Sequence, residues 1–246
     1  MILKECIFYD SDCYKKYETI NGNPKGIVVH STGANKKTLK RYVQPSKTDP
    51  NYQKILDDIG VNKYNNSLNQ TGKITCAHAY IGVNLNNEIE TYQTLPYNIC
   101  CWSCGTGKNG SFNYNPTAHI QFEILEDNLS DTNYFNKVMK EAQEYCAYLV
   151  NKFSFSVNDI VSHYGAKTMG YAGGNRLDID HWLSAFNKNM DWFRNEVQKI
   201  VDDTNTNKPT YSIMVGEYTN KESAENTAKQ LKIVFKDVSV IERRII

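Results

Sequence analysis

The sequence predicts an α/β fold, with a mixed central β-sheet flanked by helices over residues 1–201 and a small βαβ unit after it. Two patterns predict this fold. Short runs rich in β-branched and aromatic residues lie between turn residues in the first half of the chain, which is typical of strands. After them, apolar residues recur at three- and four-residue steps, the spacing of a helix that packs one face on a sheet.

The first predicted strand, Ile27–Val29, leads into a histidine. A glycine precedes this β-branched run, and Ser31 follows His30, so the histidine stands where the strand gives way to a loop. Strand ends are where α/β proteins place functional groups. From this residue alone, a buried histidine that only closes the strand is an equally good interpretation.

Two further strands are predicted to pair as a hairpin. Thr75–Val83 and Ile89–Gln93 are separated by a polar turn at Asn84–Asn87. A short helix is expected before them, near Asp49–Ile59, and another near residues 10–14, where polar residues are suited to capping.

The predicted strand Ala118–Leu125 alternates in an informative way. One face carries apolar residues, and the opposite face carries His119, Gln121 and Glu123. A polar row on an inner strand is unusual unless that face lines a cleft. We therefore expect a cleft on this face of the sheet.

Helices are predicted for much of the remaining chain. Asp131 is placed to cap a core-facing helix that runs to about Phe153, and a last helix of this domain is expected over about Trp182–Val201. The polar stretch Asp202–Pro209 indicates a linker. The pattern of residues 210–246 predicts a strand, a helix and a second strand, over Tyr211–Val215, Lys221–Lys232 and Val238–Ile241. This unit is too small to hold a good core alone.

The stretch Ile160–Trp182 carries most of the residues with metal-binding chemistry. An apolar pair leads into His163, several glycines indicate an irregular loop, and a tight polar group follows, made of Arg176, Asp178, Asp180 and His181. Histidine nitrogens and carboxylate oxygens that converge on one cation are a donor set that suits zinc. Such residues are also common on protein surfaces, so a further ligand and a base must come from elsewhere in the chain.

Charge and hydropathy disfavour several classes of protein. Lys and Arg number 28 against 27 Asp and Glu, a net charge of +1, so no long-range attraction to nucleic acid or to an anionic membrane is expected. No apolar run approaches the roughly 20 residues of a membrane helix. The N-terminal residues lack a basic segment followed by an apolar one, so we expect synthesis in the cytoplasm without a signal peptide.

Seven cysteines form an odd set, which predicts mostly free, buried thiols rather than a disulfide framework. Cys101 and Cys104 form a CxxC pair. A zinc ribbon needs a second such pair at a suitable spacing, and the sequence has none. Structural thiols are therefore the favoured interpretation.

Taken together, these segments resemble the zinc N-acetylmuramoyl-L-alanine amidases of the amidase-2 and peptidoglycan-recognition-protein type. They look closest to the phage endolysins and autolysins of clostridia and related Gram-positive bacteria. The matching segments are spread in the family's order over residues 1–200, and they read DCYKKYETINGNPKGIVVHSTGANKKTLKRYVQP, AHAYIG, ETYQTLPYN, AHIQFEILED, SHYGAKTMGYAGGN and DIDHW. The C-terminal segment YSIMVGEYTNKESAENTAKQLK resembles half of a SPOR-type peptidoglycan-binding module.

The resemblance implies a role for several residues. The implied zinc ligands are His30, His163 and Asp178, with Asp180 as the alternative acidic ligand. Three protein ligands that leave a fourth position for water are typical of a catalytic zinc. Glu123 is the implied general base, and Arg176 the residue that stabilises the developing oxyanion.

The resemblance also implies residues of the substrate cleft, namely His119, Trp102 and His78. For His78, as for His181, a supporting or packing role is the favoured alternative. Ser103 stands where relatives commonly carry a histidine that lines the cleft, which affects the expected substrate affinity but not the zinc chemistry.

The implied function is hydrolysis of the amide between N-acetylmuramic acid and L-alanine in peptidoglycan. The expected partner is the glycan strand of peptidoglycan with its stem peptide. The enzyme is expected to reach this substrate after it is released from the cytoplasm by a holin-type pore or by lysis. The C-terminal module is expected to bind the wall, and self-association through it is a further expectation. Two alternatives remain open: a non-catalytic peptidoglycan-binding protein, and a zinc peptidase that cuts within the stem peptide. The sequence has no HExxH motif to support the peptidase.

Overall fold

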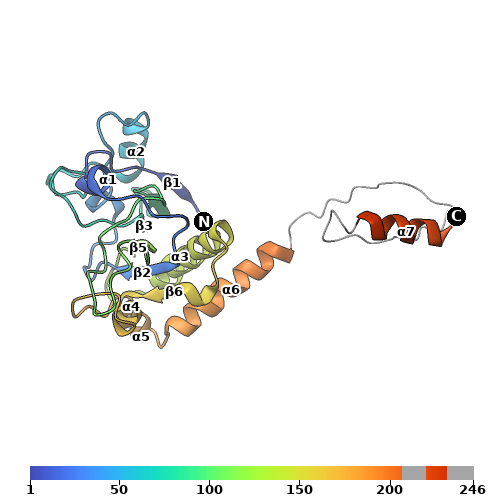
Figure 1. The fold of residues 1–246 in the computed structure, drawn as a ribbon. Helices are drawn as coiled ribbons and strands as arrows, with labels where there is room; N and C mark the ends of the chain where they lie inside the picture. Colours follow the sequence, from blue (N-terminus) through green and yellow to red (C-terminus); the bar gives the residue numbers. More distant parts are fainter. Residues whose placement is uncertain (207–219, 232–246) are drawn as a thin grey trace. The chain divides into compact units, whose positions relative to one another are not determined.

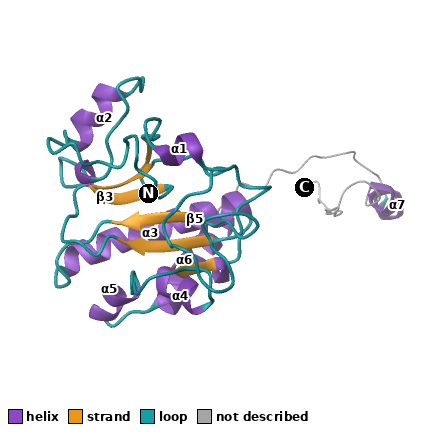
Figure 2. Cartoon of the chain, turned by 60° about the vertical axis from the view of Figure 1, so that its left-hand side comes forward, coloured by secondary structure: helices purple, strands orange, loops and turns teal. Residues whose placement is uncertain are grey.

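The structure, a computed structural model, describes residues 1–206 and 220–231, and the chain divides into two units, Met1–Thr206 and Asn207–Ile246. The first unit is built on a six-stranded sheet with the strand order β1-β4-β3-β5-β2-β6 (Figures 1 and 2). The strands are β1 (Leu3–Glu5), β2 (Ile27–Ser31), β3 (Ala79–Val83), β4 (Ile89–Gln93), β5 (Ile120–Ile124) and β6 (Ile160–Ser162).

The sheet is mixed, as predicted. β3 and β4 pair antiparallel as the predicted hairpin, whereas β3, β5, β2 and β6 all run parallel to one another. In the parallel part, His30 of β2 lies opposite Glu123 of β5. The carboxyl ends of β2, β5 and β6 therefore meet at one edge of the sheet, the edge where α/β proteins place their sites.

The sheet buries a different core on each face. On one face, the apolar residues of the predicted alternation on β5 pack with β2 and β3 against α3 (Thr132–Phe153), α5 (Asp180–Ala185) and α6 (Met190–Thr206). On the other face, Tyr80 and Tyr92 pack under α2 (Tyr52–Ile59) and the 3₁₀ helix η1 (Leu39–Arg41). The polar row of β5 faces this second side.

The long helix α3 matches its prediction closely. Asp131 caps it, because its carboxylate accepts a hydrogen bond from Tyr134 N at 3.0 Å. It ends at Ser154, whose φ of 59° lies in the left-handed region. Its buried stripe forms the centre of the larger core.

The predicted helix over about Trp182–Val201 is wrong as a single element. The structure has two helices, α5 and α6, separated by a turn at residues 186–189. Asn187 adopts a φ of 54°, and Asn189 Oδ1 accepts a hydrogen bond from Trp192 N at 2.9 Å, so one asparagine ends α5 and the other begins α6. The apolar spacing continues across this break, which is why periodicity alone does not reveal it.

The expectation of an irregular loop directly after His163 is also corrected. His163 begins a short helix, α4 (His163–Thr168), in which Gly165 is one of the helical residues. Ser162 Oγ caps it by accepting a hydrogen bond from Gly165 N at 2.9 Å. The irregular segment starts only at Met169, and a short 3₁₀ helix, η2 (Val157–Asp159), precedes β6.

The N-terminal segment adds an element that the sequence does not predict. The strand β1 pairs parallel with β4 at the edge of the sheet, and α1 (Asp12–Lys16) follows with Ser11 as its cap. Cys13 of α1 forms a disulfide with Cys76, while the five other cysteines are free and buried: Cys6, Cys100, Cys101, Cys104 and Cys146. The prediction of mostly free thiols is thus met, with one pair as the exception.

Helix α6 extends to Thr206, so the first residues of the predicted linker Asp202–Pro209 are helical. In the second unit, α7 (Lys221–Leu231) matches the predicted helix, and Asn220 Oδ1 accepts a hydrogen bond from Ser223 N at 2.8 Å at its start. The predicted strands Tyr211–Val215 and Val238–Ile241 lie outside the described residues. Nothing in the described part of this unit supports the predicted self-association. No helix among the described residues is long and apolar enough to span a membrane.

Candidate metal centre

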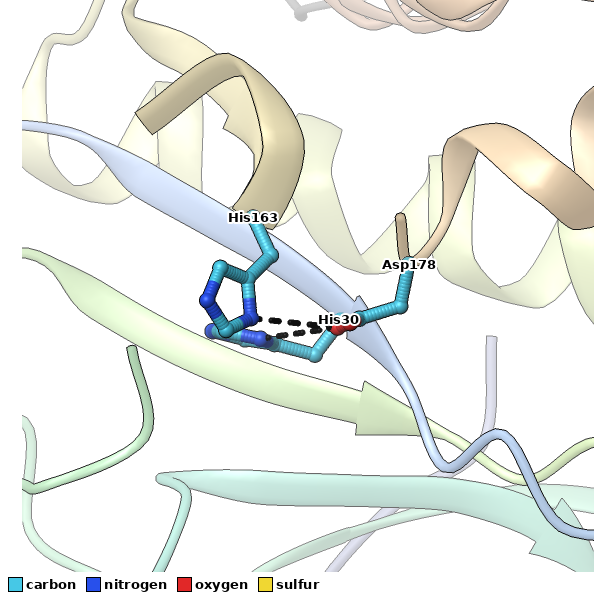
Figure 3. A group of neighbouring side chains, drawn as sticks. All are labelled: His30, His163 and Asp178. Carbon is cyan, nitrogen blue, oxygen red and sulfur yellow. Dashed lines mark hydrogen bonds and ion pairs between the residues drawn. The ribbon is translucent and has the colours of Figure 1, made fainter. Parts of the chain in front are cut away.

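Three side chains meet at the carboxyl edge of the parallel strands. His30 is on β2, His163 follows β6 as the first residue of α4, and Asp178 ends the loop before α5 (Figure 3). Asp178 Oδ2 lies 3.2 Å from His30 Nδ1 and 3.4 Å from His163 Nδ1. One ligand atom from each residue lies within 4.8 Å of the others, and all three residues are buried. Such a spacing brings the three atoms within reach of a single cation.

The second ring nitrogen of each histidine has a partner that can only accept a hydrogen bond. His163 Nε2 lies 3.2 Å from the carbonyl oxygen of Gly173, so this nitrogen must carry a proton. His30 Nε2 lies 3.0 Å from Gln121 Oε1. In the neutral rings both Nδ1 atoms then present a lone pair to the Asp178 carboxylate.

Two lone pairs and a carboxylate oxygen that face one another cannot form hydrogen bonds among themselves. Asp178 Oδ1 is also buried without a hydrogen-bond partner. A cation at the point where these atoms converge would satisfy the whole group. The residues present therefore fit a divalent metal with nitrogen and oxygen ligands, such as zinc.

The ionisation of the cluster follows from these contacts. Burial alone would raise the pKa of Asp178. When no cation is bound, protons on the two Nδ1 atoms would let His163 and His30 donate hydrogen bonds to Asp178, and these contacts outweigh burial and hold its pKa well below its ordinary value. Burial would lower the pKa of His30, yet the contact with Asp178 and the charge of Glu123 raise it. The site therefore attracts positive charge, whether as protons or as a metal ion.

Glu123 lies beside this cluster. Glu123 is paired with His30 in the register of β2 and β5, and its Oε2 atom is buried without a hydrogen-bond partner. Burial and the charge of Asp178 raise its pKa, against the opposing charges of His30, Arg176 and His163. The predicted base and two predicted ligands thus share one environment. Arg176 itself is exposed, two residues before Asp178.

The alternative acidic ligand, Asp180, is not part of the group that could hold a metal. It is the first residue of α5, and its Oδ2 has no hydrogen-bond partner. His181 also lies outside the cluster, with Nε2 3.1 Å from Glu126 Oε1. Glu126 Oε1 in turn accepts a hydrogen bond from Gly33 N at 3.1 Å, so this pair joins the loop after β2 to α5.

The structure does not bring His119 to the metal ligands, although we predicted it as a substrate-binding residue. It stands before the first residue of β5, at the opposite end of the strand from Glu123, and is only 8% exposed. Its ring stacks on Phe112 with centroids 3.8 Å apart, and Nδ1 lies 2.6 Å from Thr117 O. Alternation placed it on the correct face but could not show that this end of the face is covered.

The position of His78 favours a supporting role, the alternative already considered for it. It is fully buried, and its Nε2 donates a hydrogen bond to Ile99 O at 2.8 Å. Its Nδ1 accepts one from Gln121 N at 3.0 Å, so it holds the main chain of β5 in place. Trp102 is half-buried with its ring edge against Tyr114, and Ser103 Oγ donates to Cys76 O.

Two residues of the site environment had no role in the sequence prediction. Gln121 contacts His30, and Asn113 contacts Gln121 with its Oδ1 2.9 Å from Gln121 Nε2. Alternation did place Gln121 on the polar face of this strand, between His119 and Glu123. For Asn113, in a loop without periodicity, the sequence carries no comparable signal.

Comparisons with known proteins agree with this geometry. The family model of the N-acetylmuramoyl-L-alanine amidases, Amidase_2, matches residues 20–178. The hydrolase AmiA of Staphylococcus aureus, solved with its ligand, superposes with a TM-score of 0.52 at 16% identity, over 83% of this chain and 84% of that one. The PlyG catalytic domain superposes with a TM-score of 0.51 at 18% identity, over 85% of this chain and 100% of that one. No curated protein matches the chain.

The fold places a buried His–His–Asp group that could hold a cation at the carboxyl edge of a mixed sheet. The structural likenesses show the fold, and the family match extends from the residues before β2 to Asp178. The chain belongs to the N-acetylmuramoyl-L-alanine amidase family, and it is a peptidoglycan amidase. The comparisons do not bear on the predicted likeness to clostridial members.

Proposed function

We propose that this amidase depends on zinc held by His30, His163 and Asp178, and that it cuts the amide between the lactyl group of N-acetylmuramic acid and L-alanine. The observation that carries the proposal is the convergence of two Nδ1 lone pairs and one carboxylate oxygen beside the half-buried Glu123. Zinc bound there would polarise the scissile carbonyl and lower the pKa of the attacking water to roughly 7.

Glu123 would act as the general base. It would take the proton of the attacking water and pass it to the leaving amine of L-alanine. Burial raises the pKa of Glu123, which brings this carboxylate closer to the working pH and favours proton transfer in both directions. The exposed Arg176 would contribute positive charge near the developing oxyanion.

The unit after Thr206 is proposed to tether the enzyme to the cell wall. This proposal is supported by its short resemblance to a peptidoglycan-binding module and by the division of the chain at residue 206. Tethering raises the local concentration of substrate without adding contacts at the catalytic site. The predicted release by a pore or lysis also stays a prediction.

The activity can be tested by digesting purified peptidoglycan and identifying the new amino termini by mass spectrometry. We expect free amino groups on L-alanine and intact stem peptides, with turnover lowered on the order of 100-fold or more in a Glu123→Gln variant that still binds the wall. New amino termini within the stem peptide would identify a peptidase instead. Binding without any cleavage by the zinc-loaded protein would identify a non-catalytic peptidoglycan-binding protein.

A further inference from the structure

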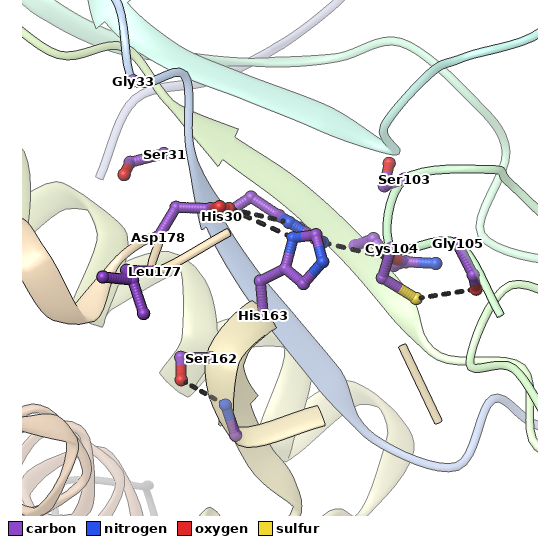
Figure 4. Close-up of polar contacts among 12 residues, drawn as sticks. His30, Ser31, Gly33, Ser103, Cys104, Gly105, Ser162, His163, Leu177 and Asp178 are labelled. Atoms are coloured by element: carbon purple, nitrogen blue, oxygen red, sulfur yellow. Dashed lines mark hydrogen bonds and ion pairs between the residues drawn. The ribbon is translucent and has the colours of Figure 1, made fainter. Parts of the chain in front are cut away.

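The loop that carries the CxxC pair contacts Gln121 and Gly173. These two residues form hydrogen bonds with His30 and His163, respectively. Figure 4 shows Ser103, Cys104 and Gly105 of this loop in the same close-up as His30 and His163. The loop belongs to neither the sheet nor a helix, and the proposed reaction assigns it no chemistry. Its hydrogen bonds nevertheless determine which nitrogen of each imidazole faces the metal position.

The orientation of the Gln121 amide is determined by its neighbours. Gln121 Nε2 lies 3.2 Å from Cys101 O and 3.4 Å from Phe112 O. Both carbonyl oxygens can only accept, so the NH₂ group must point to them and Oε1 must point to His30. His30 Nε2 then has to donate to Gln121 Oε1, which leaves Nδ1 free for the metal.

The orientation of Asn113 is determined in the same way. Its Oδ1 accepts hydrogen bonds from Ser103 N at 3.0 Å and Cys104 N at 3.1 Å, while its Nδ2 donates to Gly105 O at 2.8 Å. Asn113 is 1% exposed and Gln121 is fully buried, so water does not compete for these contacts. The chain of hydrogen bonds from the loop backbone to His30 has only one consistent orientation.

The same loop reaches His163 through its main chain. Gly173 N donates to Cys104 O at 2.8 Å, and Gly173 O accepts from His163 Nε2 at 3.2 Å. The two backbones pack so closely that a Cβ on Gly173 would lie 2.9 Å from Thr106 O. Glycine at position 173 is therefore required for this approach.

We propose that Gln121 and Asn113 are a positioning pair that makes His30 Nδ1 the metal-binding nitrogen. The loop from Cys101 to Asn113 thereby orients His30 through side chains and His163 through Gly173. Partners of this kind fix the tautomer and the ring direction of a ligand, and their loss typically costs 10- to 100-fold in metal affinity. The inference rests on the proposed metal site but adds residues that touch neither the metal nor the substrate.

The test compares the zinc affinity of the wild type with that of Gln121→Met and of Gln143→Met, by competition with a chromophoric chelator. Methionine keeps the approximate size of glutamine but loses both hydrogen-bonding groups. Gln143 is a matched control, because it is also buried (6% exposed) but lies on α3, away from the ligands. We expect zinc binding to weaken about 10- to 100-fold in Gln121→Met and to stay unchanged in Gln143→Met.

A second readout uses the wild type alone, so it does not depend on how well the variant folds. Long-range ¹H–¹⁵N spectra of the zinc-loaded protein should show the His30 proton on Nε2 and the metal on Nδ1. Coordination of His30 through Nε2, or a folded Gln121→Met variant with wild-type zinc affinity, would overturn the positioning pair while leaving the amidase proposal intact. A wild type that binds no zinc would overturn both.

Discussion

Glu123 has a buried oxygen without a hydrogen-bond partner, and it forms no ion pair with any of the described residues. Asp178 is held by two histidines, and Glu126 contacts Gly33 and His181. A general base needs a lone pair that is free to accept a proton and a pKa raised toward the working pH. Glu123 combines these two properties.

We therefore expect Glu123→Gln to keep its zinc and its fold but to lose turnover by a factor on the order of 10² or more. Glutamine has nearly the same shape but cannot accept the proton of the attacking water. Hydrolysis rates on soluble muropeptides, measured beside zinc content, check this. The exposed Glu88 gives the control Glu88→Gln, which should retain full activity. Substantial turnover in Glu123→Gln would show that another group is the base.

A second prediction concerns acid stability. Burial lowers the pKa of His119 to about 4, well below the ordinary histidine value, so the unfolded chain binds this proton more readily than the folded one. The contribution is fully present above about pH 6.5 and is lost as the pH falls toward 4. By pH 5 this loss should amount to about 2 kcal/mol of unfolding free energy.

This loss can be measured by urea unfolding at several pH values in the presence of a chelator, which removes any effect of bound metal. His119→Gln cannot titrate at this position, so its stability should fall less steeply between pH 6.5 and 5 than that of the wild type. Equal slopes for the two proteins would contradict the lowered pKa of His119.

Single residues also show what a sequence can and cannot predict about this site. The resemblance and the strand ends indicated His30, His163, Asp178 and Glu123. Parallel strands align their carboxyl ends and so bring the two histidines and Glu123 together, whereas Asp178 reaches them from the loop before α5. The tautomers, the role of Gln121 and the covering of His119 by Phe112 depend on loops that approach from distant parts of the chain. Neither periodicity nor capping describes such contacts.

At the scale of elements, the disulfide Cys13–Cys76 joins α1 to the segment before β3 across 63 residues. A cross-link that closes a loop of this length limits the unfolded chain, and the loop-entropy estimate is about 4 kcal/mol. We expect Cys76→Ser to lower the free energy of unfolding by about 2–4 kcal/mol without reductant. With reductant, the variant and the wild type should be closely similar in stability. No difference under either condition would show that the disulfide does not form in solution.

The elements also show why some predictions failed. The hairpin, the long helix α3 and the alternation of β5 follow from local patterns, and the structure confirms them. The break between α5 and α6 depends on two asparagines inside a continuous apolar pattern. The edge strand β1 has only three residues, and its pairing with β4 becomes visible only when the sheet is assembled.

At the scale of the whole molecule, the first unit contains every residue of the proposed site, and α6 closes its core with Phe193, Val197 and Val201. A chain that ends at Thr206 should therefore fold, bind zinc and hydrolyse soluble muropeptides as well as the full chain. It should sediment less with intact cell walls if the second unit is a tether. A truncated chain that is insoluble or melts far below the full chain would instead assign the second unit a stabilising role.

The proposed function requires that His30, His163 and Asp178 together hold one zinc ion. Metal analysis of the purified protein measures this occupancy, with Asp180→Asn as the matched control for Asp178→Asn. We expect about one zinc per chain in the wild type and in Asp180→Asn, and little or none in Asp178→Asn or His163→Ala. Full zinc occupancy in folded His163→Ala, or loss of zinc in Asp180→Asn but not in Asp178→Asn, would contradict this ligand set.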